Sequence, residues 1–388
     1  MVKRLVLILA VIAIALQFIR PSLDNPPVTA DFNGPADVKA IFQRSCYNCH
    51  SNQTKLAWFD EIVPAYWMVA SHVKEGRAVL NFSNWDQQKG KLFEALNQMT
   101  FQTMPLASYR FVHHDAVLND GDLATLRAYL LTLPRANITD TARTAAGDRQ
   151  YARWMSASYE PVSPTPAPNS IAFPTGFENW EVLGTSERFD NGTMRVILAN
   201  PTAIQAFRNG QTNPWPDGAT FAKIAWDEAA DDSGHIRTGE FKQVEFMIKD
   251  AGRYSATDGW GWARWVKGLA LTPYGKTAAF TSECMNCHQP MKDHDFFFSL
   301  PPAPVAPAGY ALIASSIDKG TMTTLYGNPQ AVAAARKGAS YPQDATFLLA
   351  TWTQKEDPHW FGAHIPGALL STTRRLDSVV HIRASVLP

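Results

Sequence analysis

The stretch of residues 193–201, Thr-Met-Arg-Val-Ile-Leu-Ala-Asn-Pro, predicts the fold of the larger part of this chain. Its β-branched and apolar residues are typical of a strand, and the Asn-Pro pair at its end predicts the start of a short helix. Three further stretches predict strands: residues 220–226, TFAKIAW; residues 241–249, FKQVEFMIK; and residues 260–265, WGWARW. We therefore expect residues 173–305 to form a mainly antiparallel β domain with few helices.

Composition sets the limits within which this domain is interpreted. The chain has 388 residues, which predicts two or three domains, and 46% of them are hydrophobic while 18% are charged. This is a globular composition. Thirty-five basic side chains balance thirty-five acidic ones, which excludes a broadly basic nucleic-acid-binding protein.

All four cysteines lie in two copies of one motif. The copies are Cys46-Tyr47-Asn48-Cys49-His50 and Cys284-Met285-Asn286-Cys287-His288. C-x-x-C-H is the attachment motif of c-type haem, in which two thiols bind the porphyrin edge and the histidine is the proximal iron ligand. A zinc site would need further ligands near each pair, and a thioredoxin-like pair does not require the histidine. The sequence therefore predicts two covalently bound haem c groups, with His50 and His288 as iron ligands.

The first motif lies in a segment, residues 30–137, that predicts an α-helical cytochrome c-like domain. Helical patterns precede the motif, follow it near residues 62–75, and end at Pro134. Residues 46–85 and 104–118 resemble the small haem-binding cytochrome domain of many bacterial periplasmic proteins, which implies one covalent haem and electron transfer. A proline-rich stretch, residues 161–168, predicts a semi-rigid linker across residues 138–172.

The sixth ligand of the first haem is expected from the loop between these helices. Met104, next to Pro105, is the first candidate because a thioether is a soft iron ligand that raises the reduction potential. His72 is the main alternative, and His113 and His114 are weaker ones. Met104 as simple core packing remains open.

The β domain resembles the cytochrome P-460 family, which also includes the β-sheet cytochromes c′. The resemblance rests on motifs in the family's order: MRVILANP (194–201), WPDGATFAK (215–223), MIKD (247–250), GWGWARW (259–265), SECMNCH (282–288) and DHDFFF (293–298). It implies a haem with an open distal face and, in the P-460 type, a lysine cross-linked to the porphyrin and oxidation of hydroxylamine. The cytochrome c′ type lacks the cross-link and binds nitric oxide without turnover.

The resemblance also implies roles for two residues of this chain. Lys223 falls where the cross-linking lysine is expected, and Arg195 falls where a distal arginine would bind the ligand. Strand alternation puts Lys223 on one face with Phe221 and Ala225, where a lysine is unusual. A solvent-exposed lysine and a surface ion pair are the respective alternatives. His294 or Asp295 is a further candidate for taking protons from substrate, and the sequence does not choose between them.

Residues 306–388 repeat the β domain without its haem motif. Nine of the nineteen residues in 320–338 are identical to those in 192–210, and residues 342–352 echo residues 216–226. Leu349 stands in the position of Lys223 and Thr323 in that of Arg195, and no C-x-x-C-H follows. We expect a truncated, haem-free copy of the sheet with a structural role, either packed on the haem copy or forming a pseudo-symmetric pair; a haem-free ligand pocket is the alternative. The family resemblance also implies a tendency to form homodimers.

Residues 1–22 predict export from the cytoplasm. Lys3 and Arg4 precede an apolar run that extends to Ile19, interrupted by Gln17. A cleaved signal peptide and a retained inner-membrane anchor fit equally well, because the run is short for a bilayer and lacks a good cleavage site. In both cases the rest of the chain is expected in the periplasm.

Together these features predict an exported dihaem cytochrome that oxidises a small nitrogen compound, hydroxylamine first, at the haem of the β domain. Electrons would leave through the N-terminal haem to a redox partner cytochrome or a membrane acceptor. Nitric oxide binding or sensing is the main alternative. Pure electron transfer is the third, and it is weakened because Met291 follows His288 too closely to reach the distal side.

Overall fold

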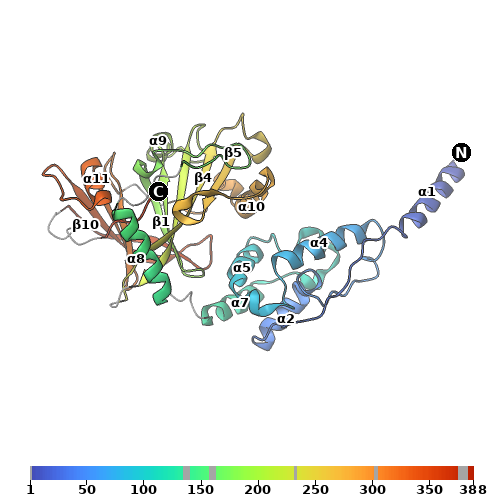
Figure 1. The fold of residues 1–388 in the computed structure, drawn as a ribbon. Coiled ribbons are helices and arrows are strands. Elements are labelled where there is room, and N and C mark those ends of the chain that lie inside the picture. Colours follow the sequence, from blue (N-terminus) through green and yellow to red (C-terminus); the bar gives the residue numbers. More distant parts are fainter. Residues whose placement is uncertain (1, 134–139, 157–162, 231–233, 301–304, 375–382) are drawn as a thin grey trace. The chain divides into compact units, whose positions relative to one another are not determined.

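The computed structural model divides the chain into two compact units, residues 1–134 and residues 135–388 (Figure 1). It describes all residues except 1, 134–139, 157–162, 231–233, 301–304 and 375–382. The first unit is helical and the second is built mainly from antiparallel strands. The predicted fold class is therefore confirmed.

The helical unit surrounds the first cysteine motif. Its helices are α1 (Val2–Leu16), α2 (Ala36–Ser45), α3 (Tyr47–His50), α4 (Ala65–Val79), α5 (Leu92–Thr100), α6 (Ala107–Val112) and α7 (Asp120–Thr132), with 3-10 turns η1 (Trp85–Gln87), η2 (Lys89–Lys91) and η3 (His114–Ala116). Helix α7 begins with a reciprocal capping box between Asn119 and Asp122. No helix among the described residues has the length and apolar character needed to cross a membrane.

The second unit contains one ten-stranded antiparallel sheet. In sheet order its strands are β10 (Ala363–Thr373), β9 (Phe347–Glu356), β8 (Thr321–Gly327), β7 (Ala311–Asp318), β1 (Glu181–Arg188), β2 (Thr193–Ala199), β3 (Thr220–Ala230), β4 (Ile236–Lys249), β5 (Trp260–Val266) and β6 (Thr272–Pro273). Its helices are α8 (Thr141–Met155), α9 (Pro201–Arg208), α10 (Thr281–His288) and α11 (Pro329–Lys337), with 3-10 turns η4 (Phe177–Asn179), η5 (Ser255–Thr257), η6 (Gly268–Ala270), η7 (Ala278–Phe280) and η8 (Gln289–His294).

Two further pairings close eight of these strands into a barrel. Strand β10 pairs with β1 through His364 and Glu187, and strand β4 pairs with β7 through Ile236 and Ile317. Strands β5 and β6 continue the sheet beyond β4. The two halves have the same order, β1-β2-α9-β3-β4 and β7-β8-α11-β9-β10, so the repeat seen in the sequence forms the second half of one barrel.

The two faces of the sheet have different roles. Val196, Leu198, Ile224 and Trp226 of the first half share one core cluster with Trp352 of the second, and this cluster fills the barrel. The alternate residues of β2 and β3 point to the other face, because successive strand residues alternate. Helix α10, which carries the second cysteine motif, contacts β5 at this side of the unit (Figure 1).

Part of the segment expected to be a linker is a helix. Residues 141–155 form α8, which begins at a capping Asp140 and contacts β3 and β4 of the barrel. Gly147 on α8 lies so close to β4 that an added Cβ would be 2.9 Å from the backbone of Gly239 and Glu240. The proline-rich stretch, residues 161–168, predicts a linker, but the helical pattern of residues 141–155 comes before it.

Candidate functional site

Helix α10 presents the second cysteine motif beside the outer face of the sheet. The Nδ1 of His288 hydrogen-bonds to the carbonyl oxygen of Phe296 at 2.7 Å, and its ring lies 4.5 Å from that of Trp262. Burial lowers the pKa of His288 to about 4, so the imidazole is neutral at physiological pH. A neutral imidazole with Nδ1 bonded to a carbonyl presents Nε2, which is the usual arrangement of an iron-binding histidine.

A row of charged side chains crosses four strands on this face. Lys223 of β3 stands opposite Ile197 of β2 on one side and Glu245 of β4 on the other, and Glu245 in turn stands opposite Arg264 of β5. Lys223 forms an ion pair with Glu245, and the Nε of Arg264 lies 3.2 Å from the Oε1 of Glu245. Arg195, two residues before Ile197 on β2, is on the same face.

Electrostatic interactions tie this charged row to the cysteine motif. Lys223 and Glu245 both act on the imidazole of His288, and Arg195 interacts with Cys287. The structure therefore brings together Lys223, Arg195 and the motif of α10. Glu245 and Arg264 were missed in the sequence; each is a charged residue inside an apolar strand, which is the signal that could have revealed them.

Burial and charge decide the protonation of this row. Burial lowers the pKa of Lys223 and lowers that of Arg195 to about 10. Burial by itself would raise the pKa of Glu245, but the charges of Lys223, Arg264 and Arg195 lower it to about 2. Glu245 is thus a fixed anion that holds Lys223 in place. A carboxylate with so low a pKa is a poor proton acceptor.

The structure separates the other two candidates of the β domain. The carboxylate of Asp295 is buried and accepts hydrogen bonds from Lys249, Trp260 and Trp215, so it is not available to a substrate. His294 is exposed, and its ring lies 5.7 Å from that of His359. Met291 is buried and lies in η8, directly after the helix of His288.

The first cysteine motif has the same local design. The Nδ1 of His50 lies 3.0 Å from the carbonyl oxygen of Gly76 and 3.1 Å from that of Leu80, and burial lowers the pKa of its imidazole. Gly76 allows α4 to approach the motif, because an added Cβ would lie 2.7 Å from the carbonyl oxygen of Cys49. Cys46, Cys49 and Cys284 are free thiols. These thiols and oriented histidines fit haem.

The candidates for the sixth ligand of the first haem lie on different elements. Met104 is in the turn between α5 and α6 and is 37% exposed. His72 lies on α4 and is partly exposed, and His114 is exposed. The Nε2 of His113 is 3.1 Å from Asp60, so this nitrogen is engaged. Met104 stays the prediction.

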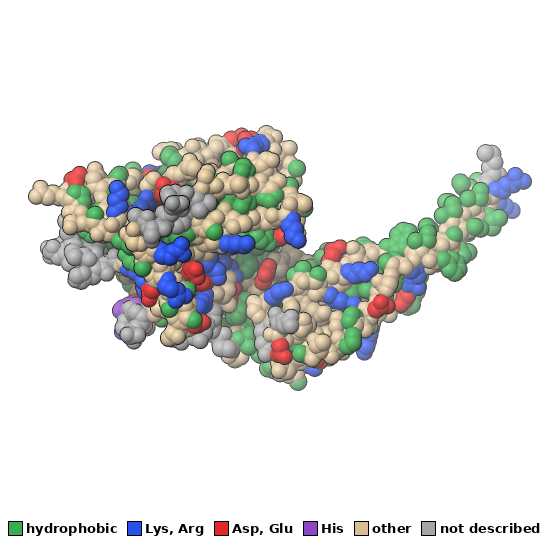
Figure 2. All heavy atoms as spheres, in the orientation of Figure 1, with side chains coloured by type: hydrophobic (Ala, Val, Ile, Leu, Met, Phe, Trp, Pro, Cys, Tyr) green, Lys and Arg blue, Asp and Glu red, His purple; other side chains and the backbone are tan. Residues whose placement is uncertain are grey.

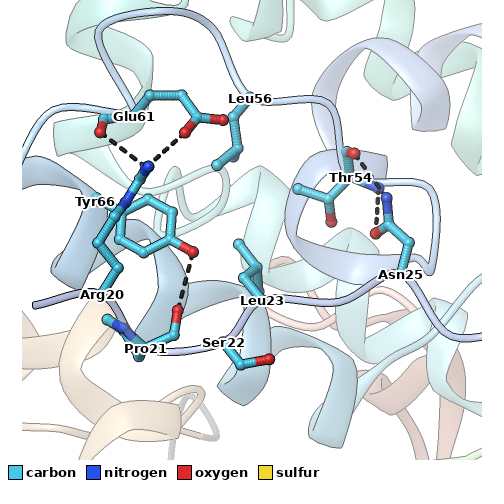
Figure 3. A pocket seen from close by; sticks show the side chains of 9 residues that line it. All are labelled: Arg20, Pro21, Ser22, Leu23, Asn25, Thr54, Leu56, Glu61 and Tyr66. Carbon is cyan, nitrogen blue, oxygen red and sulfur yellow. Dashed lines mark hydrogen bonds and ion pairs between the residues drawn. The ribbon is translucent and has the colours of Figure 1, made fainter. Parts of the chain in front are cut away.

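A cavity of about 400 Å³ lies in the helical unit, and no residue of the first cysteine motif lines it. Figure 3 shows it between residues 20–25 and the loop that precedes α4. Arg20 binds Glu61 across it, the hydroxyl of Tyr66 donates to the carbonyl oxygen of Pro21 at 2.9 Å, and Asn25 exchanges hydrogen bonds with Thr54. It is a groove left where the N-terminal segment lies on the helical unit.

Comparison with known families finds one family model over each of the two segments that carry a cysteine motif. Residues 11–132 match the model of a haem-binding domain, and residues 174–299 match the Cytochrome P460 model. This chain joins a haem-binding domain to a cytochrome P460 domain. No curated protein matches it. The cytochrome P460 match covers strands β1 to β6 and ends after the second cysteine motif, so strands β7 to β10, the second half of the barrel, lie outside it.

Proposed function

We propose that this haem cytochrome is a dihaem enzyme that oxidises hydroxylamine, or a closely similar nitrogen compound, at the haem of its P460 domain. The observation that carries the proposal is the charged row of Lys223, Glu245 and Arg264, with Arg195 beside it, on the sheet face next to His288. Two cysteine motifs with matching histidine orientation support two covalently bound haem c groups.

The chemistry requires an iron site that accepts electrons and side chains that orient a small polar molecule. Oxidation of two hydroxylamines to nitrous oxide and water releases four electrons and four protons. Bound haem would supply the electron acceptor. Arg195 carries the ligand-binding role in this proposal, since its Nε is buried with no hydrogen-bond partner among the described residues. The N-terminal haem would pass electrons on to a partner cytochrome or membrane acceptor.

Lys223 is the residue that distinguishes hydroxylamine oxidation from nitric oxide binding without turnover. Its amine is held at a fixed position by the ion pair with Glu245, on the sheet face beside His288, and burial lowers its pKa although Glu245 acts in the opposite direction. We expect Lys223 to be cross-linked to the haem bound by Cys284 and Cys287.

The first test is the mass of the haem peptide from the P460 domain, with an optical spectrum of the reduced protein. A peptide joining Lys223 to the haem of Cys284 and Cys287, with a strongly red-shifted Soret band, is expected. Lys223→Met should lower hydroxylamine-dependent reduction of an acceptor by at least roughly tenfold, the effect of about 1.4 kcal/mol on the transition state. Lys242→Met is the matched control, because Lys242 pairs with Asp227 outside the row.

Nitric oxide binding without turnover is the second candidate. It is favoured by Phe221, which lies two residues before Lys223 on the same face, is 2% exposed and packs 4.5 Å from Phe297. An unmodified Lys223 with an ordinary high-spin haem c spectrum would contradict the hydroxylamine proposal. Tight nitric oxide binding without product formation would then support this second function.

Export to the periplasm is part of the proposal. Helix α1 is covered by exposed apolar side chains, with Lys3 and Arg4 at its start (Figure 2). Beyond it, Gln17 exchanges hydrogen bonds with Val63, and the indole of Trp67 donates to the carbonyl oxygen of Ile19 at 2.5 Å. The N-terminal peptide mass of protein from membrane and soluble fractions tests the two forms: an intact N-terminus in the membrane fraction indicates an anchor, and a shortened one in the soluble fraction indicates a signal peptide. Full-length protein in the cytoplasm would contradict export.

A further inference from the structure

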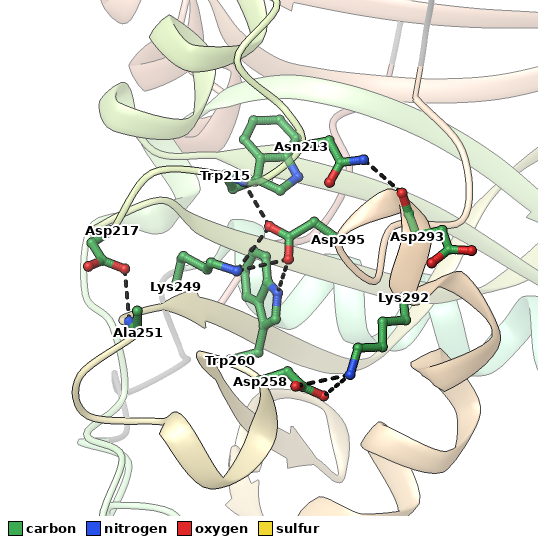
Figure 4. Close-up of polar contacts among 10 residues, drawn as sticks. All are labelled: Asn213, Trp215, Asp217, Lys249, Ala251, Asp258, Trp260, Lys292, Asp293 and Asp295. Atoms are coloured by element: carbon green, nitrogen blue, oxygen red, sulfur yellow. Dashed lines mark hydrogen bonds and ion pairs between the residues drawn. The ribbon is translucent and has the colours of Figure 1, made fainter.

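A buried ion pair lies next to the segment that holds His288. Lys249, the last residue of β4, donates to both carboxylate oxygens of Asp295, at 2.8 and 3.0 Å (Figure 4). Both side chains are 8% exposed. A buried pair of this kind is weak evidence for stability alone, because desolvation of both charges offsets their attraction. Its position suggests another role.

Asp295 is held by three separate parts of the domain. Besides Lys249, the indole Nε1 of Trp260 on β5 donates to it at 3.0 Å, and the backbone N–H of Trp215 donates at 2.7 Å. The ammonium of Lys249 also lies 4.6 Å from the ring centre of Trp260. Figure 4 shows these groups converging on the carboxylate. Asp295 is thereby fixed to both β4 and β5.

The backbone at this point adopts a conformation that needs such support. Asp295 has φ of 47° and the next residue, Phe296, has φ of 68°. Left-handed backbone is disfavoured for residues with a Cβ, and for a bulky residue it persists only when the surroundings impose it. The bonds to Asp295, together with the burial of Phe296, impose it here.

The carbonyl oxygen of Phe296 is the acceptor for the proximal histidine. It lies 2.7 Å from the Nδ1 of His288. A left-handed conformation at Asp295 and Phe296 therefore decides where this carbonyl oxygen is placed. A hydrogen bond to Nδ1 makes the imidazole a more basic ligand, and a more basic ligand favours the oxidised iron.

We propose that Asp295 and Lys249 are positioning residues that set the reduction potential of the P460-domain haem through the Phe296–His288 hydrogen bond. This inference rests on His288 as the iron ligand and does not depend on the substrate. The first haem is an internal reference, because the described contacts of the Nδ1 of His50 are with the backbone carbonyl oxygens of Gly76 and Leu80 on a different unit of the chain.

The test compares the reduction potentials of both haems in holoprotein carrying Asp295→Asn or Lys249→Gln. Asp295→Asn loses the charge but keeps an acceptor oxygen, and Lys249→Gln keeps the bonds from Trp260 and Trp215. We expect the reduction potential of the P460-domain haem to rise in both variants, and to rise more in Asp295→Asn. The potential of the first haem should stay unchanged. As this potential rises, the iron–histidine stretching frequency of the reduced protein should fall, because the hydrogen bond to the Nδ1 of His288 is weaker.

The neighbouring ion pair provides the control. Lys292 and Asp258 interact at 3.2 Å in the same view, but they are 54% and 44% exposed (Figure 4). Lys292→Gln should change neither potential. If Asp295→Asn does not retain haem, the reduction potentials of Lys249→Gln decide the test. Unchanged potentials in Lys249→Gln, or equal shifts of both haems, would overturn the proposal, and neither result would bear on hydroxylamine oxidation.

Discussion

The ionisation of Glu245 is determined by its neighbours. It lies inside an apolar strand, between Val244 and Phe246, yet it remains ionised because Lys223 and Arg264 contact it. Removing one partner of such a group leaves the others with unbalanced charge, which costs more than the pair itself contributes. The position of Lys223 in the proposed site therefore depends on a residue that no motif identifies.

Replacing Glu245 should change the acid sensitivity of the fold. Its pKa is lowered from 4.5 to about 2, so its stabilising contribution is present above about pH 4.5 and is lost as the pH falls toward 2. Glu245→Gln should lower the free energy of unfolding by roughly 1–3 kcal/mol at pH 7, with the difference closing near pH 2. Denaturant titrations at both pH values measure this. Glu240→Gln, on the same strand outside the row, is the control; an equal loss at both pH values would contradict the linkage.

Helix α8 is the element whose role the sequence did not indicate. Arg143 binds Asp227 of β3 at 2.6 Å, and Asp148 pairs with Arg237 of β4 and with Arg383 near the end of the chain. The carbonyl oxygen of Gly147 accepts a further bond from Arg383 at 2.9 Å. These contacts join α8 to the barrel, so it belongs to the second unit, residues 135–388.

Gly147→Ala separates helix propensity from packing. Propensity alone predicts that the alanine stabilises α8 by about 1 kcal/mol. The added Cβ would meet β4 backbone at 2.9 Å, and overpacking of this kind costs roughly 1–3 kcal/mol, so we expect lower stability. Thermal unfolding measures the sign. Gly252→Ala, whose Cβ would find only an Asp250 oxygen at 3.6 Å, should show no such loss. A higher melting temperature for Gly147→Ala would show that α8 does not pack tightly on β4.

At the scale of the whole molecule, the repeat that lacks a cysteine motif completes the barrel. Each half leaves two outer strands to pair with the other half, through β10 with β1 and β4 with β7. The barrel core is shared, since Leu348, Ala350 and Trp352 pack in the same cluster as Trp226. A half without its partner would expose this cluster and two strand edges, which favours aggregation.

Deleting residues 306–388 should therefore prevent folding of the P460 domain. We expect a chain of residues 135–305 to be insoluble or to lack a cooperative unfolding transition. Residues 135–388, which form one compact unit, should be soluble and unfold cooperatively. Solubility and thermal unfolding of both chains check this. A stable, monomeric 135–305 chain would show that the repeat is dispensable to the fold.

The sequence by itself determined the cofactor class, the two-domain order, the strand pattern and the existence of the repeat. These features are local: a five-residue motif, the alternation of residues 193–198 and the identities between residues 192–210 and 320–338 are visible along the chain. Tertiary structure alone decided that Lys223 meets Glu245, that Asp295 is held by Lys249, and that residues 306–388 close the barrel. Such contacts join strands far apart in sequence, and their register depends on the packing of the whole sheet, which no single stretch encodes.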